Sequence, residues 1–177
     1  LLELGKLTRE EVLVRRYEIL FQEVGMSCDA KKISEKYEDF LGEGHYFIPG
    51  AKELLEDLSK KYHLYLASNG AVKVQMSRIQ SAGIEKYLEK IFLSEQIGYE
   101  KPSPQFFEKC FAQIPDFKKE EALILGDSLT SDIRGGKNAG ILTVWFHPSG
   151  KKVEEEIVPD YEIGKLEELK TILSFYS

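Results

Sequence analysis

The stretch EEALILGDSLTSDIRGGKNAG, residues 120–140, decides the fold of this chain. Its apolar run at residues 122–125 is short and bounded by turn residues, which predicts a buried strand. A polar turn follows, and then a helix-like stretch whose glycine pair, Gly135-Gly136, permits close packing of helix on sheet. A strand, a turn and a helix in this order are half of a β-α-β unit, so the stretch predicts an α/β protein.

Two carboxylates follow the predicted strand, Asp127 directly after it and Asp132 a few residues later. Open α/β sheets bind their ligands just past the carboxyl ends of strands. Carboxylate oxygens there suit Mg²⁺, which takes one or two carboxylates together with water and phosphate oxygens. The alternative is that both aspartates only cap the next helix. This stretch alone leaves both interpretations open.

The composition sets wide limits on the class of protein. A chain of 177 residues, 42% apolar and 31% charged, can form one domain with a sizeable core. The net charge of −6 argues against a nucleic-acid surface. No apolar run is long enough for a transmembrane helix, and no signal peptide is recognisable. Cys28 and Cys110 show no metal-ligand spacing, so a cytoplasmic setting is the simplest expectation.

Two domains are predicted, at residues 1–46 and 47–177. The first shows only helical patterns: Thr8 with Glu11 forms a capping-box signature, and a second amphipathic helix runs from about residue 29 to 41. The second alternates between strand and helix, which predicts a Rossmann-like parallel sheet with helices on both faces. Its predicted strands are residues 64–67, 91–93, 122–125, 142–146 and 161–163, and its predicted helices are residues 50–58, 71–82, 103–112, 130–139 and 166–175.

Polar clusters follow three of these strands: Ser68-Asn69-Gly70, Lys101, and Asp127 with Asp132. Because parallel strands end at the same edge of a sheet, we expect these clusters to converge. A hydroxyl, an amide and free N–H groups bind phosphate oxygens, a lysine adds positive charge, and aspartates hold a metal. Taken singly, the first cluster is also a plain turn with a helix cap, and the lysine a solvated loop residue.

The order S-N-G, then K-P, then GDSxxxD resembles the second, third and fourth motifs of the haloacid dehalogenase (HAD) superfamily. The resemblance covers residues 47–177, and residues 1–46 match part of the helical cap found between the family's first and second motifs. Longer strings, such as ASNGAVKVQMSRIQSAGI and ILGDSLTSDIRGGKNAGILTVWF, resemble the pyrimidine-type 5′-nucleotidases and, slightly less, N-acylneuraminate-9-phosphatase.

On the phosphate side, the resemblance implies that Ser68 donates a hydrogen bond to a phosphoryl oxygen. Asn69 and the amide of Gly70 would support the same pocket. Lys101 would bridge the nucleophile and the phosphoryl group, offsetting the repulsion between two anions. The catalytic set implied is therefore Ser68 and Lys101 together with Asp127.

On the metal side, the resemblance implies that Asp127 ligates Mg²⁺. Asp132 would orient the site from behind or ligate through water. The pair Gly126-Asp127 argues against the dehalogenating branch, which works without Mg²⁺ and tends to carry a different fourth motif.

The family's first motif, DxDxT/V, holds the aspartyl nucleophile and the general acid, and it is absent from this sequence. The nearest acidic residues, Glu3 and the pair Glu10-Glu11, lie in helical sequence and cannot replace it. In the family that strand runs between the strands ending at Ser68 and Asp127, and its loss would leave buried backbone groups unpaired. We therefore expect these residues to be part of a longer chain, and a fragment of this kind to be inactive.

The expected function is a Mg²⁺-dependent phosphomonoester hydrolase with an aspartyl-phosphate intermediate, acting on nucleoside 5′-monophosphates. The expected partner is a small phosphorylated metabolite, with no nucleic-acid polymer and no membrane, and the expected assembly is a monomer or homodimer. Two alternatives stay open: a sugar or sugar-acid phosphatase or phosphomutase of the same superfamily, and a non-catalytic HAD-like regulator that lacks the nucleophile.

Overall fold

The computed structural model describes residues 8–150 and 156–176, which form two compact units. The helical unit combines the residues up to Tyr46 with Ala71–Gly83, and the sheet unit combines Phe47–Gly70 with the residues from Ile84 onward. Glu3 and the other residues of 1–7 lie outside the described part. The predicted domains, residues 1–46 and 47–177, divide the chain at a single point, and that division stays a prediction.

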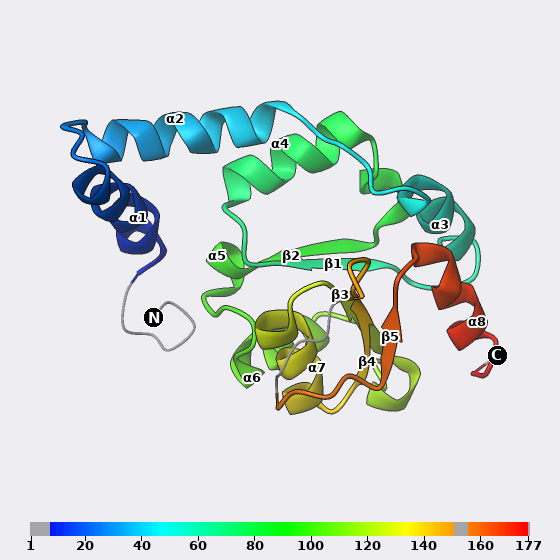
Figure 1. Ribbon diagram of the computed structural model, residues 1–177. Coiled ribbons are helices and arrows are strands. Elements are labelled where there is room, and N and C mark those ends of the chain that lie inside the picture. Colours follow the sequence, from blue (N-terminus) through cyan, green and yellow to red (C-terminus); the bar gives the residue numbers. More distant parts are fainter. Residues whose placement is uncertain (1–7, 151–155, 177) are drawn as a thin grey trace. The chain divides into compact units, whose positions relative to one another are not determined.

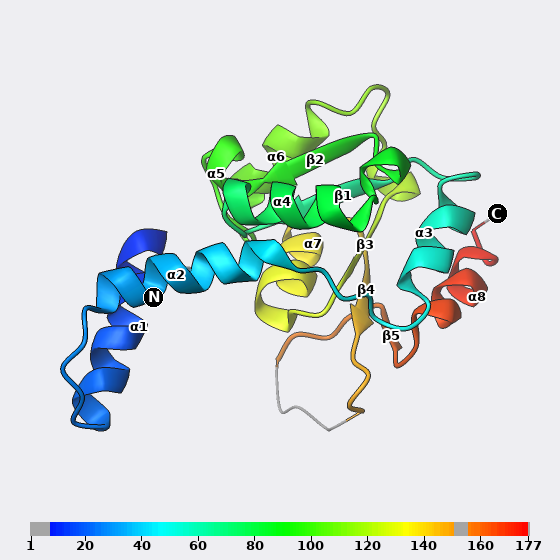
Figure 2. The same cartoon turned by 90° about the horizontal axis from the view of Figure 1, so that it is seen from above.

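The described helices of the helical unit are α1 (Arg9–Glu23), α2 (Ala30–Glu43) and α4 (Val72–Ala82) (Figure 2). The predicted capping box is present, since Thr8 Oγ1 accepts from the amide of Glu11 and the Glu11 side chain accepts from the amide of Thr8. Helix α4 ends at Gly83, whose φ of +64° lies in the left-handed region that glycine adopts without strain.

Helix α2 is joined to each of its two neighbours by a side chain to backbone hydrogen bond. The buried Ser34 donates to the carbonyl of Leu13 on α1 at 3.2 Å. On the other side, Ser77 of α4 donates to the carbonyl of Gly42 at 2.7 Å. These side chain to backbone bonds join the three helices into one body.

The strands of the sheet unit are β1 (Tyr65–Ser68), β2 (Lys90–Leu93), β3 (Leu123–Gly126), β4 (Leu142–Phe146) and β5 (Tyr161–Ile163). Every described pair is parallel: β1 with β2, β3 with β4, and β4 with β5. Helices alternate with these strands along the chain, so the predicted α/β fold is confirmed.

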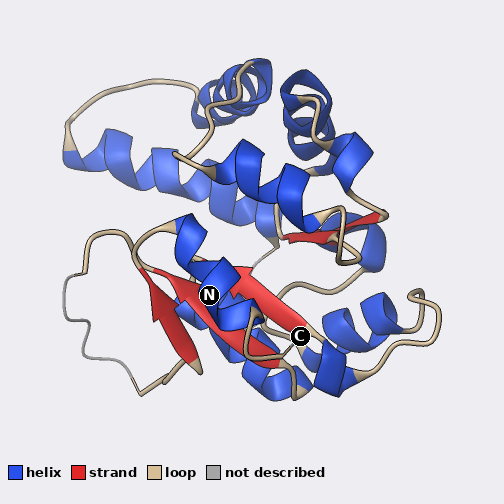
Figure 3. Ribbon diagram, turned by 90° about the vertical axis from the view of Figure 1, so that its right-hand side faces the viewer, coloured by secondary structure: helices blue, strands red, loops and turns tan. Residues whose placement is uncertain are grey.

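The described strands form two sheets instead of the single sheet expected, one of order β1-β2 and one of order β3-β4-β5 (Figure 3). The physical reason is that no described strand lies between β1 and β3 to pair with both. Each of these two strands therefore has one edge without a strand partner among residues 8–150 and 156–176.

The helices of the sheet unit are α3 (Ala51–Leu58), α5 (Ser94–Ile97), α6 (Pro104–Phe111), α7 (Arg134–Ala139) and α8 (Leu169–Leu173), joined by short turns η1 (Glu85–Tyr87), η2 (Lys119–Glu121) and η4 (Leu166–Glu168). Two details differ from the sequence expectation. The segment before Lys101 is not all loop, because it contains α5. The helix expected at 130–139 begins as a π-helical turn, η3 (Leu129–Ile133), and continues as α7.

Apolar side chains pack on both sides of the strands. One cluster lies between α3, α8 and the strands β4 and β5 (Figure 1). Its buried members are Leu54, Val144, Phe146, Ile163, Leu166, Leu169 and Ile172. At the surface, the ion pair of Lys170 with Asp57, at 2.5 Å, joins the same two helices. The other large cluster gathers residues of β2, α6 and α7 and the residue before β4, namely Phe92, Phe106, Phe107, Cys110, Ala139 and Ile141.

The glycine pair of α7 lies where helix, sheet and α6 approach closely. A Cβ added to Gly136 would lie 2.5 Å from Ile124 Cγ2, and one added to Gly135 would lie 2.6 Å from the Phe107 ring. The close packing predicted from this pair is therefore present. Within the described ranges, no helix has both the length and the apolar character that a membrane span requires.

Candidate functional site

Lys101 connects the loop after β1 with the turn after β3. Its side chain is buried, and Nζ donates to the carbonyl oxygen of Ala67 at 2.6 Å and to Asp132 Oδ1 at 2.6 Å. The solvated loop position that the residue could have had by itself is therefore excluded. The ion pair brings together polar residues that follow two strands of different sheets.

Asn69 holds the main chain of Lys101 with both ends of its amide. Its Oδ1 accepts from the Lys101 amide at 2.9 Å, and its Nδ2 donates to the Lys101 carbonyl at 2.9 Å. The same Nδ2 lies 3.5 Å from Ser131 Oγ, next to Asp132. These contacts fix the backbone of the lysine, and the expected support of the phosphate pocket by Asn69 stays a prediction.

Ser68 ends β1 and is half-buried. Its Oγ accepts from the amide of Gly70 at 3.0 Å, which closes a tight turn at the start of the loop. Within the part of the chain that the structure describes, its hydroxyl proton has no acceptor. Ser68 is therefore able to donate to an incoming anion at the carboxyl end of β1.

The two aspartates have different surroundings. Asp132 is buried, and its second oxygen, Oδ2, accepts from the amide of Ser128 at 3.1 Å. Asp127 is exposed, and its carboxylate makes no hydrogen bond or ion pair with any described residue. Both carboxylate oxygens of Asp132 are thus bonded within the protein, whereas the carboxylate of Asp127 is exposed and available to a ligand.

The peptide group between Asp127 and Ser128 is held at both polar ends. Trp145 on β4 donates its indole Nε1–H to the carbonyl of Asp127 at 2.9 Å, and Asp132 accepts from the Ser128 amide. Trp145 is 9% exposed, and nothing in the sequence indicated this hydrogen bond. The bond forms across neighbouring strands, since Gly126 and Trp145 are register partners.

The donor set around Asp127 fits Mg²⁺ only as a site with few protein ligands. Among residues 8–150 and 156–176, no cluster of three or more His, Cys, Asp or Glu side chains could enclose a metal. Mg²⁺ nevertheless accepts one or two carboxylates and fills its other positions with water and phosphate oxygens. Asp127 would hold it directly, and Asp132, whose oxygens are already used, would act on the site from behind.

The buried thiol nearest to this group of residues is not a nucleophile. Burial raises the pKa of Cys110 to about 12, although the positive charge of Lys101 acts in the opposite direction. The thiolate is the reactive form, so Cys110 is inert at neutral pH and serves as a core residue of α6.

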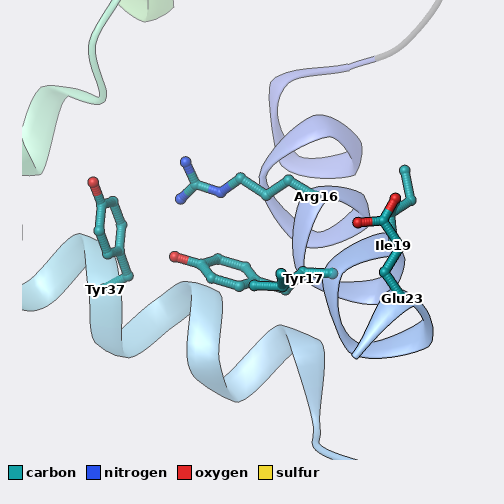
Figure 4. Close-up of a pocket in the computed structure, with 6 residues that line it drawn as sticks. Arg16, Tyr17, Ile19, Glu23 and Tyr37 are labelled. Carbon is teal, nitrogen blue, oxygen red and sulfur yellow. The ribbon is translucent and has the colours of Figure 1, made fainter. Parts of the chain in front are cut away.

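The helical unit has a hollow of its own, of about 420 Å³, between α1 and α2. The guanidinium of Arg16 lies over the rings of Tyr17 and Tyr37, 4.8 Å from each centroid (Figure 4). Ile19, Leu20 and Glu23 complete its lining. None of the residues expected from the sequence to bind a ligand lies in this hollow.

The parallel β/α arrangement has a serine at the end of β1 and two aspartates after β3, and Lys101 bonds to both segments. It defines a Rossmann-like α/β protein. The family model of the haloacid dehalogenase-like hydrolases matches residues 4–146. The chain belongs to this family.

Named relatives support the same assignment. The Bacillus subtilis HAD-hydrolase YfnB is 43% identical over 172 residues, covering 97% of this chain and 73% of the relative. Its crystal structure bound to magnesium superposes with a TM-score of 0.91, covering 97% of this chain and 75% of that one. The pyrimidine 5′-nucleotidase PynA of Streptococcus pneumoniae is 37% identical over 169 residues, covering 95% of this chain and 71% of the relative.

A 2-haloacid dehalogenase of Pseudomonas syringae has a similar structure, with a TM-score of 0.71 and 25% identity, covering 96% of this chain and 71% of that one. Proteins with different reactions in their names therefore share this fold. The fold gives the hydrolase family, and the reaction has to be argued from the site.

Proposed function

We propose that the protein is a Mg²⁺-dependent phosphomonoester hydrolase that acts through an aspartyl-phosphate intermediate on nucleoside 5′-monophosphates. The observation that carries the proposal is the convergence of Ser68, Lys101 and the Asp127–Asp132 segment, joined by the hydrogen bonds of Lys101 to Ala67 and Asp132. Hydroxyl, ammonium and exposed carboxylate are the groups that bind a phosphoryl group and its counter-ion.

Each residue has a task that its contacts support. Ser68 donates its hydroxyl proton to a phosphoryl oxygen, because the turn to Gly70 uses only its acceptor side. Lys101 supplies positive charge, and Asn69 fixes the backbone that carries it. The buried Lys101–Asp132 ion pair is fixed before the substrate arrives, so little reorganisation is needed when charge develops on the phosphoryl oxygens.

The nucleophile is part of the proposal, and no described residue supplies it. We place it on a strand between β1 and β3, whose free edges could each accept a parallel partner. Its carboxylate would attack phosphorus, the phosphorus–oxygen ester bond would break, and a second carboxylic acid would protonate the leaving alkoxide. Water would then hydrolyse the acyl phosphate, releasing inorganic phosphate and restoring the carboxylate.

The metal would be held by the Asp127 carboxylate. When bound, Mg²⁺ neutralises negative charge on the phosphoryl oxygens and orients the group for in-line attack. The exposed carboxylate of Asp127, fixed through its backbone by Trp145, is the feature of this chain that supports such a site. The magnesium-bound crystal structure of YfnB supports the same assignment.

A nucleotide substrate is favoured by the likeness to PynA, which is named as a pyrimidine 5′-nucleotidase and covers almost the whole chain. The alternatives are a sugar or sugar-acid phosphatase or phosphomutase, and a non-catalytic regulator without a nucleophile. A preference for sugar phosphates would distinguish the first alternative from the proposal. A complete absence of turnover would distinguish the non-catalytic regulator.

The test is a phosphate-release panel on the full-length protein. Nucleoside 5′-monophosphates, sugar phosphates and p-nitrophenyl phosphate are compared with Mg²⁺ and with EDTA. We expect release from the nucleotides and p-nitrophenyl phosphate only with Mg²⁺. Release that persists in EDTA would overturn the metal requirement, and release confined to sugar phosphates would favour the first alternative. No release under any condition would favour the regulator.

A further inference from the structure

Trp145 supplies neither a phosphate donor nor a metal ligand in the proposed function, but it bonds to the residue that would hold the metal. It lies on β4, the central strand of the β3-β4-β5 sheet, and only 9% of its surface is exposed. A buried indole needs an acceptor for its N–H, and the acceptor here is the carbonyl oxygen of Asp127 at 2.9 Å. Any buried carbonyl oxygen could have accepted this hydrogen bond. The one that accepts it belongs to Asp127, the residue with the exposed carboxylate.

The hydrogen bond to Asp127 acts on one side of a peptide group whose other side is also held. Asp132 Oδ2 accepts from the Ser128 amide at 3.1 Å, and Asp132 Oδ1 pairs with Lys101. With its carbonyl and its N–H both bonded, this peptide cannot rotate without losing a partly buried hydrogen bond. The backbone of Asp127, and with it the direction in which its carboxylate leaves the chain, is fixed from both sides.

The indole contacts the residue that follows its own strand, and that residue contacts β5. Its ring stacks on the imidazole of His147, with centroids 4.0 Å apart and an angle of 17° between the planes. His147 Nδ1 lies 2.9 Å from Glu162 Oε1, and Glu162 is the register partner of Trp145 on β5. A continuous series of contacts therefore runs from β5 through the indole to the backbone of Asp127.

We propose that Trp145 is a positioning residue for the metal site, which holds the Asp127 carboxylate in its ligating direction through the hydrogen bond to the Asp127 carbonyl. The inference rests on the proposed function, because it takes Asp127 to be the ligand of Mg²⁺. Removing a residue that orients a metal ligand lowers the affinity for the metal about 10- to 100-fold. Because Trp145 bonds to the backbone of the ligand residue, we expect the lower end of that range.

The test measures Mg²⁺ binding directly in the full-length protein, by calorimetry and by the indole N–H signal in a ¹H–¹⁵N spectrum. In the wild type, Mg²⁺ should shift the Trp145 indole signal, assigned through its backbone connectivity, and Asp127→Asn should abolish the shift. Trp145→Phe keeps the aromatic ring and removes the N–H donor. We expect its dissociation constant for Mg²⁺ to rise about 10-fold.

Tyr161→Phe is the matched control, since it removes one aromatic hydrogen bond, to Tyr176, from β5 of the same sheet. It should bind Mg²⁺ as the wild type does. Equal affinity in Trp145→Phe and the wild type, or an equal loss in Tyr161→Phe, would overturn the inference and leave the proposed function intact. If Trp145→Phe does not fold, a wild-type indole signal that does not shift when Mg²⁺ is added overturns the inference by itself. A wild type that does not bind Mg²⁺ would overturn the metal assignment, and this inference with it.

Discussion

Lys101 Nζ lies 2.6 Å from Asp132 Oδ1, and the two side chains are 8% and 11% exposed. The lysine also bonds to the carbonyl of Ala67, and the aspartate also accepts from the Ser128 amide, so each charge has more than one partner. A buried ion pair of this kind is costly to form and more costly to break, because the remaining charge stays buried without its partner.

Lys101→Met should therefore destabilise the protein by about 3–5 kcal/mol, because it leaves the Asp132 carboxylate buried and unpaired. The measurement is urea unfolding followed by circular dichroism. Lys73→Met is the control: Lys73 pairs with Asp39 at a similar distance, 2.6 Å, but their side chains are 84% and 56% exposed, so its loss should not change stability measurably. Equal effects of the two substitutions would contradict this account of the buried pair.

Asp127→Asn should lower phosphate release by orders of magnitude while the melting temperature stays unchanged. The side chain is exposed and has no hydrogen-bond partner among the described residues, so stability does not depend on its charge. Asp39→Asn, which removes a carboxylate from the surface of the helical unit, should keep full activity. An active Asp127→Asn enzyme would show that the metal ligand lies elsewhere.

Gly136→Ala should destabilise the sheet unit by about 1–3 kcal/mol, because the new methyl group overpacks the contact of α7 with β3 and β4. The added Cβ would lie 2.5 Å from Ile124 Cγ2 and 2.7 Å from Thr143 Cγ2. Gly164→Ala is the matched control, since no atom lies within 4 Å of its added Cβ. Thermal unfolding of both variants checks the prediction, and a neutral Gly136→Ala would mean that the helix can shift away.

Asp160 should make stability depend on pH on the acid side. Burial acts to raise the pKa of Asp160, but hydrogen bonds from Lys137 and Thr143 outweigh it and hold the pKa below its usual value. The unfolded chain, with a pKa of about 3.9, then binds more protons than the folded one between the two values. The contribution is complete above the unfolded pKa and is lost as the pH falls through the folded pKa.

The check is the difference in unfolding free energy between the wild type and Asp160→Asn, measured from pH 6 down to acid conditions. It should be constant above the unfolded pKa and shrink below it. Lys137→Met removes one of the bonds that lower the pKa and should weaken this dependence. A difference that stays constant to the lowest pH would contradict the shifted pKa.

Local chemistry made much of the fold predictable from sequence. The capping box of Thr8 and Glu11 depends only on neighbours within a few residues, and it is present. The strand at Tyr161–Ile163 was predicted to the residue. The π-helical start at Leu129 was not, because it depends on the bonds that Ser128 makes with Asp132 and Ile133 in the folded turn.

The sequence indicated which residues would lie close together in the candidate site, but not which hydrogen bonds would join them. Strand order indicated that Ser68, Lys101 and Asp132 would meet, and the bonds of Lys101 to Ala67 and Asp132 join the end of β1 to the turn after β3. That Asn69 would hold the Lys101 backbone depends on residues 32 positions apart, and no local pattern encodes such a pair. The roles of these residues in binding and catalysis stay predictions.

The 177 residues contain one tryptophan, and it lies in the β3-β4-β5 sheet. Its ring packs with Leu129, Ile133 and Ile157 and stacks on His147. The fluorescence of Trp145 therefore reports on this sheet alone, whereas circular dichroism sums over the helices of both units. If the two signals change at different urea concentrations, the units unfold separately, and coincident curves mean that they unfold as one.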